Sequence, residues 1–437
     1  MNDYERAVRA SSSARDDLAD RLALAMETVR RSSPEPAPLA SIATGVAAPA
    51  TLGLVLWAIE RAADAGCERI YFAGRNGRLA FEVYERLPEA VTGGVSGTYI
   101  RISRNVVRQA SAARDLDRWI DCGHATPTSF LRQYAGRLPL RRLLERATAE
   151  PDRHEALVRS IGLDLSRPLP DGADAAWRAL FDHPEIRASI AEASATARPI
   201  LVEWLAQHGV FDHRQVALVD VGWRGQQAAM LDAVVDAEGS TRILHLHLGR
   251  NKAETLVADA SIERWLIDVD RPLVPNPVAL FETLFATTER GLVDLIREGG
   301  IVVPVMRHAD DPVARSPHIE PLGRLVGEVI AEAAVTSSDR SVDLRDVVAA
   351  IVTRFWEQPT VEEARWWSAV PYELDAAGRI IKPLATPVGL GELATVLRSR
   401  SLGDRQWGRG AVMASAAAIR VVLDVAQRRG RSTAGRG

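Results

Sequence analysis

The residue types and spacing best suited to binding chemistry lie between 213 and 227, in the sequence HRQVALVDVGWRGQQ. An apolar run at 216–219 ends in Asp220. Gly222 and Gly225 follow, and an amphipathic stretch begins at Gln227. This order predicts a buried strand, a tight loop and a helix. In an open α/β sheet ligands bind at such loops, and the free N–H groups of a helix start favour an anion.

A second segment of the same kind lies upstream. Residues 69–73 are typical of a strand, 74–78 of a turn that contains Gly74 and Gly77, and 79–87 of a helix. A third strand, predicted at 97–102, ends in Ser103 and Arg104. We expect the bends after the first strand and before the helix at 227 to meet at one edge of a single sheet.

Three residues are candidates for catalysis: Asp220, Arg75 and Arg104. Asp220 could hold sugar hydroxyls or a Mg²⁺-bound diphosphate, or it could only hydrogen bond to loop amides. Arginine suits bidentate recognition of phosphate, although Arg75 could also be an ordinary surface residue. The residues expected to bind substrate or phosphate are Gly74, Asn76, Gly77, Ser103, Gly222, Trp223, Arg224, Gly225, Gln226 and Gln227.

Other candidates are weaker. His245 and His247 lie two apart on a predicted strand and therefore share a face, which favours a polar sheet face over a metal site. Mg²⁺ near Asp220 is the one metal that the sequence suggests, and no organic cofactor is predicted. Tryptophans at 356, 366, 367 and 407 could line a cleft, but tryptophans near turns usually complete a core.

The bulk composition excludes several classes of protein. The chain has 437 residues, 47% of them hydrophobic, with a net charge of −3, so a large core is available and nucleic-acid binding is not expected. Cys67 and Cys122 are far apart and predict no disulfide framework. We expect no signal peptide, and the apolar stretch at 46–59 is too short to span a membrane. A cytoplasmic location is therefore expected.

The pattern predicts an α/β fold with a mostly parallel, Rossmann-like sheet, a helical insertion and a helical C-terminal region. A helix is expected over residues 4–31, and a strong helix over 51–65. The domains expected are an N-terminal helix and linker at 1–44, an α/β core at 45–111 and 196–310, an insertion at 112–195, a helical region at 311–427 and a disordered tail at 428–437.

Several blocks resemble a domain that accompanies haloacid-dehalogenase-superfamily hydrolase modules in bacterial surface-polysaccharide proteins. That domain carries blocks similar to FLARDG, SRR and VDIGWHGT. Here they correspond to FAGRNG at 72–77, SRN at 103–105 and VDVGWRGQQ at 219–227, and the stretches 53–65 and 277–291 resemble its flanking helices. Asn76 replaces the family's usual aspartate, and Asp220-Val221-Gly222 lacks the second aspartate of the hydrolase's Asp-x-Asp pattern.

The layout is also similar to that of type I phosphoribosyltransferases. In that family a short Gly/Arg loop binds pyrophosphate and a later acidic strand end with a glycine loop binds a sugar 5-phosphate. Arg75 to Gly77 and Asp220 to Gln227 fill these places in the same order. The family's acidic pair is reduced to Asp220 followed by Val221.

Three hypotheses about function follow. The first is an enzyme of the phosphoribosyl or glycosyl transfer type that acts on a phosphorylated sugar or a sugar-diphosphate donor. The second is a non-catalytic protein that binds a sugar phosphate or acts as a scaffold for a hydrolase or glycosyltransferase partner. The third is a phosphatase of the haloacid dehalogenase type. The sequence leaves the oligomeric state open.

Overall fold

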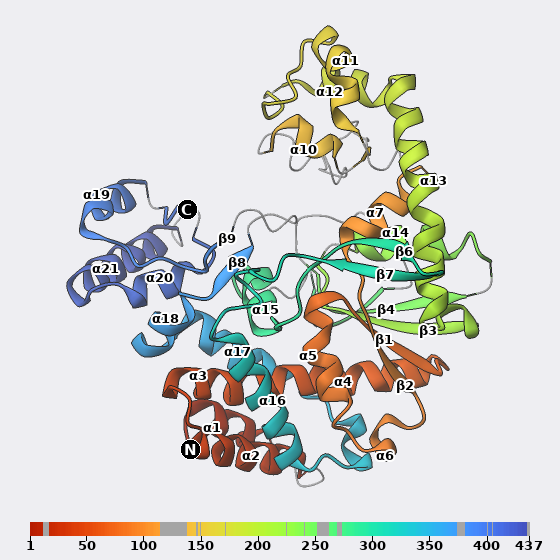
Figure 1. Cartoon of the computed structure of the whole chain (residues 1–437). Coiled ribbons are helices and arrows are strands. Elements are labelled where there is room, and N and C mark those ends of the chain that lie inside the picture. Colours follow the sequence, from red (N-terminus) through yellow and green to blue (C-terminus); the bar gives the residue numbers. More distant parts are fainter. Residues whose placement is uncertain are drawn as a thin grey trace.

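The computed structural model shows an α/β protein built around one parallel sheet (Figure 1). The five strands are β1 (Arg69–Ala73), β2 (Ser96–Ile100), β3 (Gln215–Asp220), β4 (Arg242–Gly249) and β5 (Ile262–Ile267). They lie in the order β2-β1-β3-β4-β5, and every neighbouring pair is parallel. The predicted α/β class with a mostly parallel sheet is confirmed. The structure describes residues 1–11, 17–113, 138–145, 147–148, 150–170, 172–223, 225–239, 241–250, 262–268, 273–373, 381–399, 401–403 and 405–434.

Helices cover both faces of this sheet. Along β1, Phe72 packs into one hydrophobic core and Tyr71 into the other, because neighbouring side chains of a strand point to opposite faces. Since both faces are buried, the central strands are apolar along their length, as parallel strands usually are. The helices of one face are α4 (Ala48–Asp64), α5 (Gly74–Tyr84) and α16 (Ile319–Ala333), and those of the other are α7 (Arg104–Ser111), α13 (Pro184–Gln207) and α14 (Gln226–Val235).

The chain leaves the two central strands in opposite directions. From β1 it passes through α5 on one face to β2, whereas from β3 it passes through α14 on the other face to β4. The point between β1 and β3 is therefore a topological switch point, where loops at the carboxyl ends of the strands diverge and leave a crevice. This arrangement, rather than either segment alone, positions the candidate site.

The segment after β1 differs from its prediction. Residues 74–78 were expected to form a turn, but α5 already begins at Gly74. Gly74 has a φ of +67°, which lets the chain bend out of the strand within one residue. The helix then lies so close to β1 that a Cβ on Gly77 would sit 2.9 Å from the carbonyl carbon of Phe72.

The N-terminal region forms two helices instead of the single one expected over 4–31. They are α1 (Asp3–Ala10) and α2 (Leu18–Ser32), and residues 12–16 between them lie outside the described residues. A capping box starts α1, since the Glu5 amide donates to the Asn2 side chain and the Asn2 amide donates to the Glu5 carboxylate. Serines follow α1, and serine competes with helix by bonding to nearby backbone groups.

A long apolar helix runs through the centre of the molecule. It combines α3 (Ala37–Ile42), a π-helical segment (Ala43–Ala47) and α4 into one stretch of 28 residues, Ala37–Asp64. The apolar stretch at 46–59 was predicted to be too short for a membrane span, but the helix that contains it is longer. Pro49 is the second residue of α4, and it does not end the helix. The helix is long and apolar enough to cross a membrane, but its apolar window is 100% buried inside the protein.

The region between α7 and β3 contains short helices, within residues 140–182, that stand apart from the sheet at the top of Figure 1. Its helices pack around Trp177 and Phe181, and the 24-residue helix α13, which contains Pro199, connects them to the sheet. This helix crosses residue 195, where the sequence placed a domain boundary. The other elements here are α10 (Leu140–Leu144), a 3-10 turn (Pro151–His154), α11 (Glu155–Ser160) and α12 (Asp174–Asp182).

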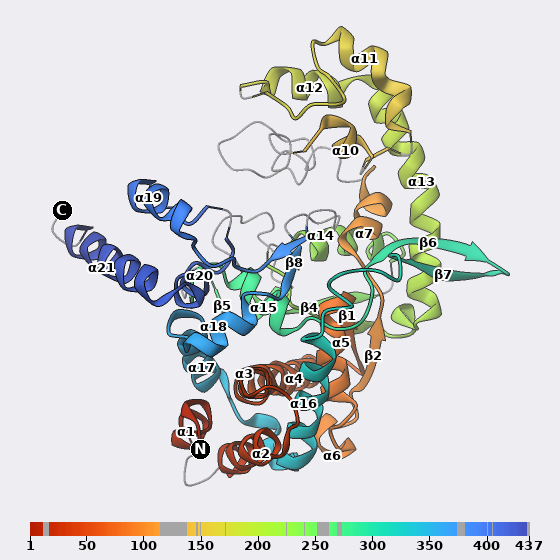
Figure 2. The same ribbon diagram turned by 60° about the vertical axis from the view of Figure 1, so that its left-hand side comes forward.

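The rest of the chain adds helices and two hairpins. One hairpin is formed by β6 (Leu292–Glu298) and β7 (Ile301–Met306), and it extends from the body in Figure 2. A second, short hairpin of β8 (Pro371–Glu373) and β9 (Ile381–Pro383) was not predicted. The helices are α15 (Pro277–Leu284), α17 (Arg345–Glu357), α18 (Val361–Trp367), α19 (Leu390–Ser399), α20 (Gly408–Ala414) and α21 (Ala417–Ala434), with α6 (Glu89–Thr92) and 3-10 turns at Val210–Asp212 and Ser337–Ser341 elsewhere.

The C-terminal tail and the tryptophans can be compared with their predictions. The tail from 428 was expected to be disordered, whereas α21 continues to Ala434. Trp356, Trp367 and Trp407 are buried in the core rather than lining a cleft.

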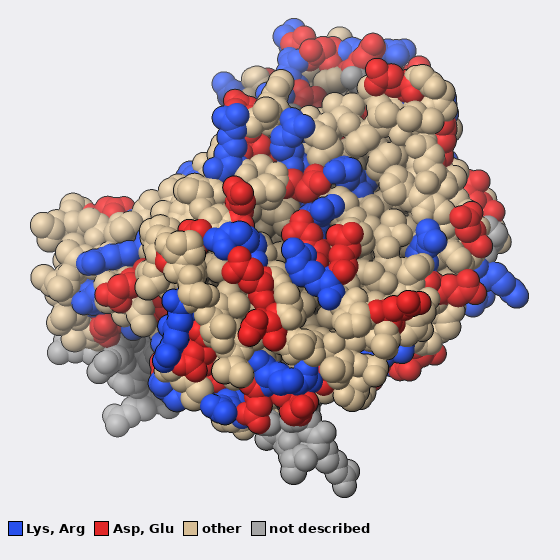
Figure 3. Space-filling model, turned by 60° about the horizontal axis from the view of Figure 1, so that its bottom comes forward, with Lys and Arg blue, Asp and Glu red and all other residues tan. Residues whose placement is uncertain are grey.

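Cys67 is buried and free, and Cys122 lies outside the described residues. On the face drawn in Figure 3, charges of both signs are interspersed.

Candidate functional site

A cavity of about 350 Å³ lies at the carboxyl ends of β1 and β3, at the switch point of the sheet. Binding crevices in open α/β sheets form at this position. Its volume is at the lower end of the range for small-molecule sites, which is about 300–1,000 Å³. The cavity is lined by Ala73, Gly74, Arg75, Asn76, Ile102, Ser103, Arg104, Asn105, Asp220, Val221, Gly222, Trp223, Gln227, Val278, Glu282, Gly291, Leu292, Arg307, Tyr372 and Glu373.

The two bends predicted to meet do meet there. Phe72 of β1 pairs with Val219 of β3, so the residues that follow each strand reach the same edge. Residues in the first turn of α5, of α7 and of α14 line the cavity. Each of these helix starts carries amides that lack an intrahelical acceptor, together with a partial positive charge, and both features favour a bound anion.

Most of the sequence-predicted residues line this cavity, but not all of them do. Gly74, Arg75, Asn76, Ser103, Arg104, Asp220, Gly222, Trp223 and Gln227 belong to its walls. Gly77, Gly225 and Gln226 do not: Gly77 lies against β1, Gly225 has a φ of +68° at the start of α14, and Gln226 is buried. Arg224 lies outside the described residues.

Asp220 combines both roles that the sequence allowed. Its carboxylate accepts hydrogen bonds from the Gly222 and Val221 amides, and it also lines the cavity. Burial raises the pKa of this carboxyl group, and the two amides and the positive charge of Arg104 only partly offset that effect. A Cβ on Gly222 would lie 3.0 Å from Asp220 Oδ2, so a larger residue would crowd the carboxylate.

Ser103 and Arg104 reach the cavity from the end of β2. The Ser103 hydroxyl caps α7 by accepting a hydrogen bond of 3.4 Å from the Val106 amide. This cap fixes the first turn of the helix, so Arg104 is held at the cavity wall. Its charge opposes the rise in the pKa values of Asp220 and Glu282, so the guanidinium lies near both carboxyl groups.

Four functional residues come from parts of the chain that the sequence analysis did not connect to the site. They are Glu282 of α15, Arg307 after β7, and Tyr372 and Glu373 of β8. Nothing in the local pattern marks them, because they reach the cavity only through tertiary packing. Glu282 did lie within the stretch 277–291 that resembled a family helix, which was the one available signal.

Glu373 joins two arginines. Its Oε1 atom accepts hydrogen bonds from Arg75 Nη1 at 2.7 Å and from Arg307 Nη1 at 2.6 Å. Burial raises the pKa of Glu373, but both arginines outweigh this effect and the pKa is lowered. Arg307 also lies 3.7 Å from Asp311 Oδ2. The carboxylate of Glu373 is therefore ionised at neutral pH and neutralises part of the arginine charge.

Glu282 is in a different state. Burial raises its pKa, and the charges of Arg104 and Arg75 and a hydrogen bond from Tyr372 only partly offset that effect. Burial also raises the pKa of Tyr372, with Glu282 nearby adding to the shift, so the phenol stays neutral and donates. Two carboxyl groups with raised pKa values, Asp220 and Glu282, thus share one cavity with three arginines. Such perturbed groups cluster at functional sites.

The two histidines of β4 are not arranged as a metal site. His245 Nε2 lies 2.7 Å from Asp232 Oδ1, and His247 is buried with its pKa lowered to about 3 by desolvation and by the charges of His245 and Arg264. Among the described residues, no group of three or more His, Cys, Asp or Glu side chains could hold a metal ion. The pair forms a buried polar patch next to Asp220, which is paired in register with His247.

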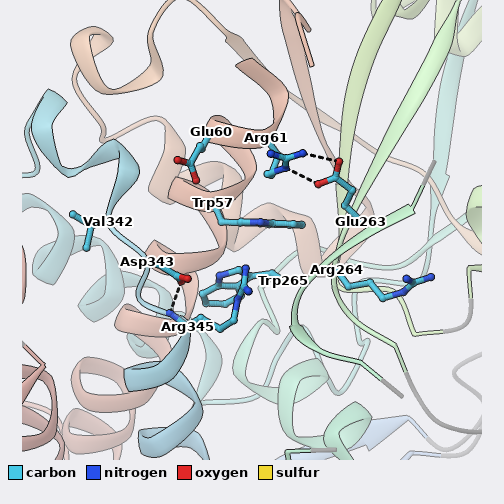
Figure 4. A pocket seen from close by; sticks show the side chains of 10 residues that line it. Trp57, Glu60, Arg61, Glu263, Arg264, Trp265, Val342, Asp343 and Arg345 are labelled. Atoms are coloured by element: carbon cyan, nitrogen blue, oxygen red, sulfur yellow. Dashed lines mark hydrogen bonds and ion pairs between the residues drawn. The ribbon is translucent and has the colours of Figure 1, made fainter. Parts of the chain in front are cut away.

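A second cavity, of about 340 Å³, lies between α4, β5 and the segment before α17 (Figure 4). Trp57 crosses its centre, Arg61 forms hydrogen bonds of 2.6 and 3.0 Å with Glu263, and Arg264 points away. Trp265 packs on α4 at Gly53, where a Cβ would lie 2.6 Å from the ring. Of the sequence-predicted residues that the structure describes, none lines this cavity.

Comparison with known proteins adds no family assignment. No model of a protein family matches the chain, and no curated protein sequence matches it. The cavity at the switch point is therefore the basis for assigning a function.

Proposed function

We propose that the cavity at the carboxyl ends of β1 and β3 binds a phosphorylated sugar or a sugar diphosphate, and that the protein is an enzyme of the phosphoribosyl or glycosyl transfer type. One observation carries the proposal. Arg75, Arg104 and the first turns of three helices line one small cavity together with the carboxyl groups of Asp220 and Glu282. Cations and amides suit a phosphate, and carboxylates suit sugar hydroxyls, so the cavity offers partners for both halves of such a ligand.

Each residue then has a defined task. Arg75, Arg104 and the amides at the start of α14 hold the anionic group and stabilise the charge that develops on a leaving diphosphate. Asp220 and Glu282 accept hydrogen bonds from sugar hydroxyls and orient the ring. Asp220 is also the carboxylate that would hold a Mg²⁺ ion bound with the diphosphate, and such an ion would add positive charge at the leaving group. Rate enhancement comes mainly from positioning and electrostatics.

The carboxyl groups with raised pKa values support chemistry rather than binding alone. A group buried next to the ligand can take or give a proton near neutral pH more readily than an exposed carboxylate. Asp220 lies at a strand end that the fold holds rigidly, between the amides of Val221 and Gly222. A proton acceptor for an incoming hydroxyl needs such fixed placement, and we assign that task to Asp220.

A non-catalytic binding protein is the second candidate. The specific observation in its favour is that Glu373 already neutralises part of the charge of Arg75 and Arg307. A protein that only senses or carries a sugar phosphate needs no free catalytic arginine. Its partner would then be a separate hydrolase or glycosyltransferase, as the resemblance of residues 72–77, 103–105 and 219–227 implies.

Calorimetry tests the proposal. The full chain is titrated with phosphoribosyl pyrophosphate and Mg²⁺, and then with a panel of sugar nucleotides, and we expect saturable binding of at least one of them. The Asp220→Asn variant separates the two candidates. If the protein is an enzyme, this variant loses turnover. If it is a binding protein, the unmodified protein has no turnover and the variant still binds its partner. Heat-silent titrations with every member of the panel would refute the proposal.

A further inference from the structure

Arg75 and Arg307 come from distant parts of the chain and converge on a single oxygen atom. Arg75 is the second residue of α5, and Arg307 directly follows β7. Their Nη1 atoms lie 2.7 and 2.6 Å from Glu373 Oε1. Arginine forms such charge-assisted hydrogen bonds with phosphate oxygens as well as with carboxylates, so a phosphate could take the place of this carboxylate.

Both arginines are held by contacts that do not involve Glu373. The backbone carbonyl of Arg75 accepts a hydrogen bond of 3.3 Å from the Thr287 hydroxyl. The backbone amide of Arg307 donates to the Gly291 carbonyl at 2.9 Å, and its carbonyl accepts from Arg290. The backbone positions of both arginines therefore do not depend on the carboxylate between them.

From this geometry we infer that Arg75 and Arg307 form the subsite for the ligand's phosphate or diphosphate group, and that the Glu373 carboxylate occupies this subsite until the ligand displaces it. The inference rests on the proposed function and extends it, because it assigns the anionic end of the ligand to the wall made by α5 and β7. Arg104 then remains a further partner of the anionic group, and Asp220 and Glu282 face the remaining part of the ligand.

Charge explains why a phosphate group can displace Glu373. One carboxylate carries a single negative charge, whereas a phosphate group carries about −1.5 to −2 at pH 7 and three strong acceptor oxygens. The phosphate can therefore accept from both guanidinium groups at once with more charge and better geometry. Glu373 also lines the cavity, so its carboxylate lies where an entering ligand arrives.

A purely structural ion pair is the competing explanation, and the chain offers a matched control for it. Glu289 accepts hydrogen bonds of 2.7 and 3.3 Å from Arg101. The side chains of Glu289 and Glu373 are similarly accessible, 18% and 13% exposed. Glu289 does not line the cavity. Neutralising Glu289 therefore removes a comparable ion pair without freeing the proposed subsite.

The experiment measures binding of inorganic pyrophosphate, without a divalent cation, to the full chain by calorimetry. We expect Glu373→Gln to bind it about tenfold more tightly than the unmodified protein, the order expected when one competing charged hydrogen bond is removed. Glu289→Gln should bind it as the unmodified protein does, and Arg307→Gln should bind it about tenfold more weakly. Thermal unfolding checks that each variant is folded.

A second variant keeps the test decisive if Glu373→Gln does not fold. Glu373→Asp retains the charge and withdraws it by one methylene group, so its affinity for pyrophosphate should lie between those of the unmodified protein and Glu373→Gln. Unchanged or weaker binding in a folded Glu373 variant overturns the inference, and so does an equal gain in Glu289→Gln.

The outcomes also separate this inference from the proposed function. If the unmodified protein binds a phosphorylated sugar but the Glu373 variants bind pyrophosphate no better, the subsite assignment fails and the proposed function stands. If the Glu373 variants bind pyrophosphate more tightly but no phosphorylated sugar binds, the anion subsite stands and the sugar ligand does not. If none of these proteins binds either probe, both fail.

Discussion

Replacing Gly77 with alanine tests whether this glycine serves packing rather than ligand binding. A Cβ at this position would lie 2.9 Å from the carbonyl carbon of Phe72, 3.5 Å from its oxygen and 3.6 Å from its Cα. Non-bonded carbon atoms normally stay about 3.5–4.0 Å apart. The neighbouring atoms belong to the backbone of β1, so no side chain can rotate away, and α5 must move off the strand.

Two opposing terms set the size of the effect. Alanine in place of glycine inside a helix stabilises it by about 1 kcal/mol. Overpacking a tight contact costs about 1–3 kcal/mol. We therefore expect Gly77→Ala to lower the free energy of unfolding by about 1 kcal/mol, and by about 2 kcal/mol if β1 does not adjust.

Gly323→Ala in α16 is the matched control, because the nearest atom to its Cβ is Leu79 Cδ1 at 3.9 Å. Because nothing crowds this position, only the better helix propensity of alanine contributes. The free energy of unfolding of Gly323→Ala should therefore be about 0.5–1 kcal/mol higher than that of the unmodified protein. Urea unfolding followed by tryptophan fluorescence compares both with the unmodified protein. A stability gain in Gly77→Ala equal to that in Gly323→Ala would show that the packing argument is wrong.

Three further predictions concern titration and the N-terminal helices. Because the folded pKa of Glu373 is lowered, its stabilising contribution is complete above the unfolded value of about 4.3 and is lost as the pH falls through the folded value. The Glu373→Gln variant should therefore show a smaller fall in melting temperature between about pH 5 and pH 3; an unchanged slope would contradict this. Desolvation lowers the pKa of His247 to about 3, so the unfolded chain binds a proton that the folded chain does not, and stability should rise with pH between the folded value and about 6.5. The Cε1 proton resonance of His247 should stay constant in NMR spectra from about pH 5 to pH 8, and a titration in that range would disprove its burial as a neutral ring. The Tyr4 hydroxyl donates a hydrogen bond of 2.8 Å to Glu363 and accepts one of 2.7 Å from Arg354. The free energy of unfolding of Tyr4→Phe, measured in urea, should therefore be about 1–3 kcal/mol lower. Equal stability would mean that this buried network contributes nothing.

Much of the sheet could be predicted from the sequence. The apolar runs at 69–73 and 216–219 and the helical spacing after each of them identified β1, α5, β3 and α14, because residues buried on both faces of a parallel strand leave a continuous apolar pattern. The helix boundaries were less predictable. The sequence predicts that Gly74 belongs to a turn. In the structure Gly74 is instead the first residue of α5, and its positive φ bends the chain directly from β1 into this helix.

Some residues of the candidate site could likewise be predicted from the sequence, and others could not. Asp220, Arg75 and Arg104 could be identified from sequence alone, because each follows a strand whose end is fixed by local pattern. Glu282, Arg307, Tyr372 and Glu373 could not, since no local pattern records which distant segment packs over the end of a sheet. The sequence thus determined which strand ends carry polar groups. Only the tertiary structure decided which other charges face them, because that depends on how α15, β7 and β8 pack together.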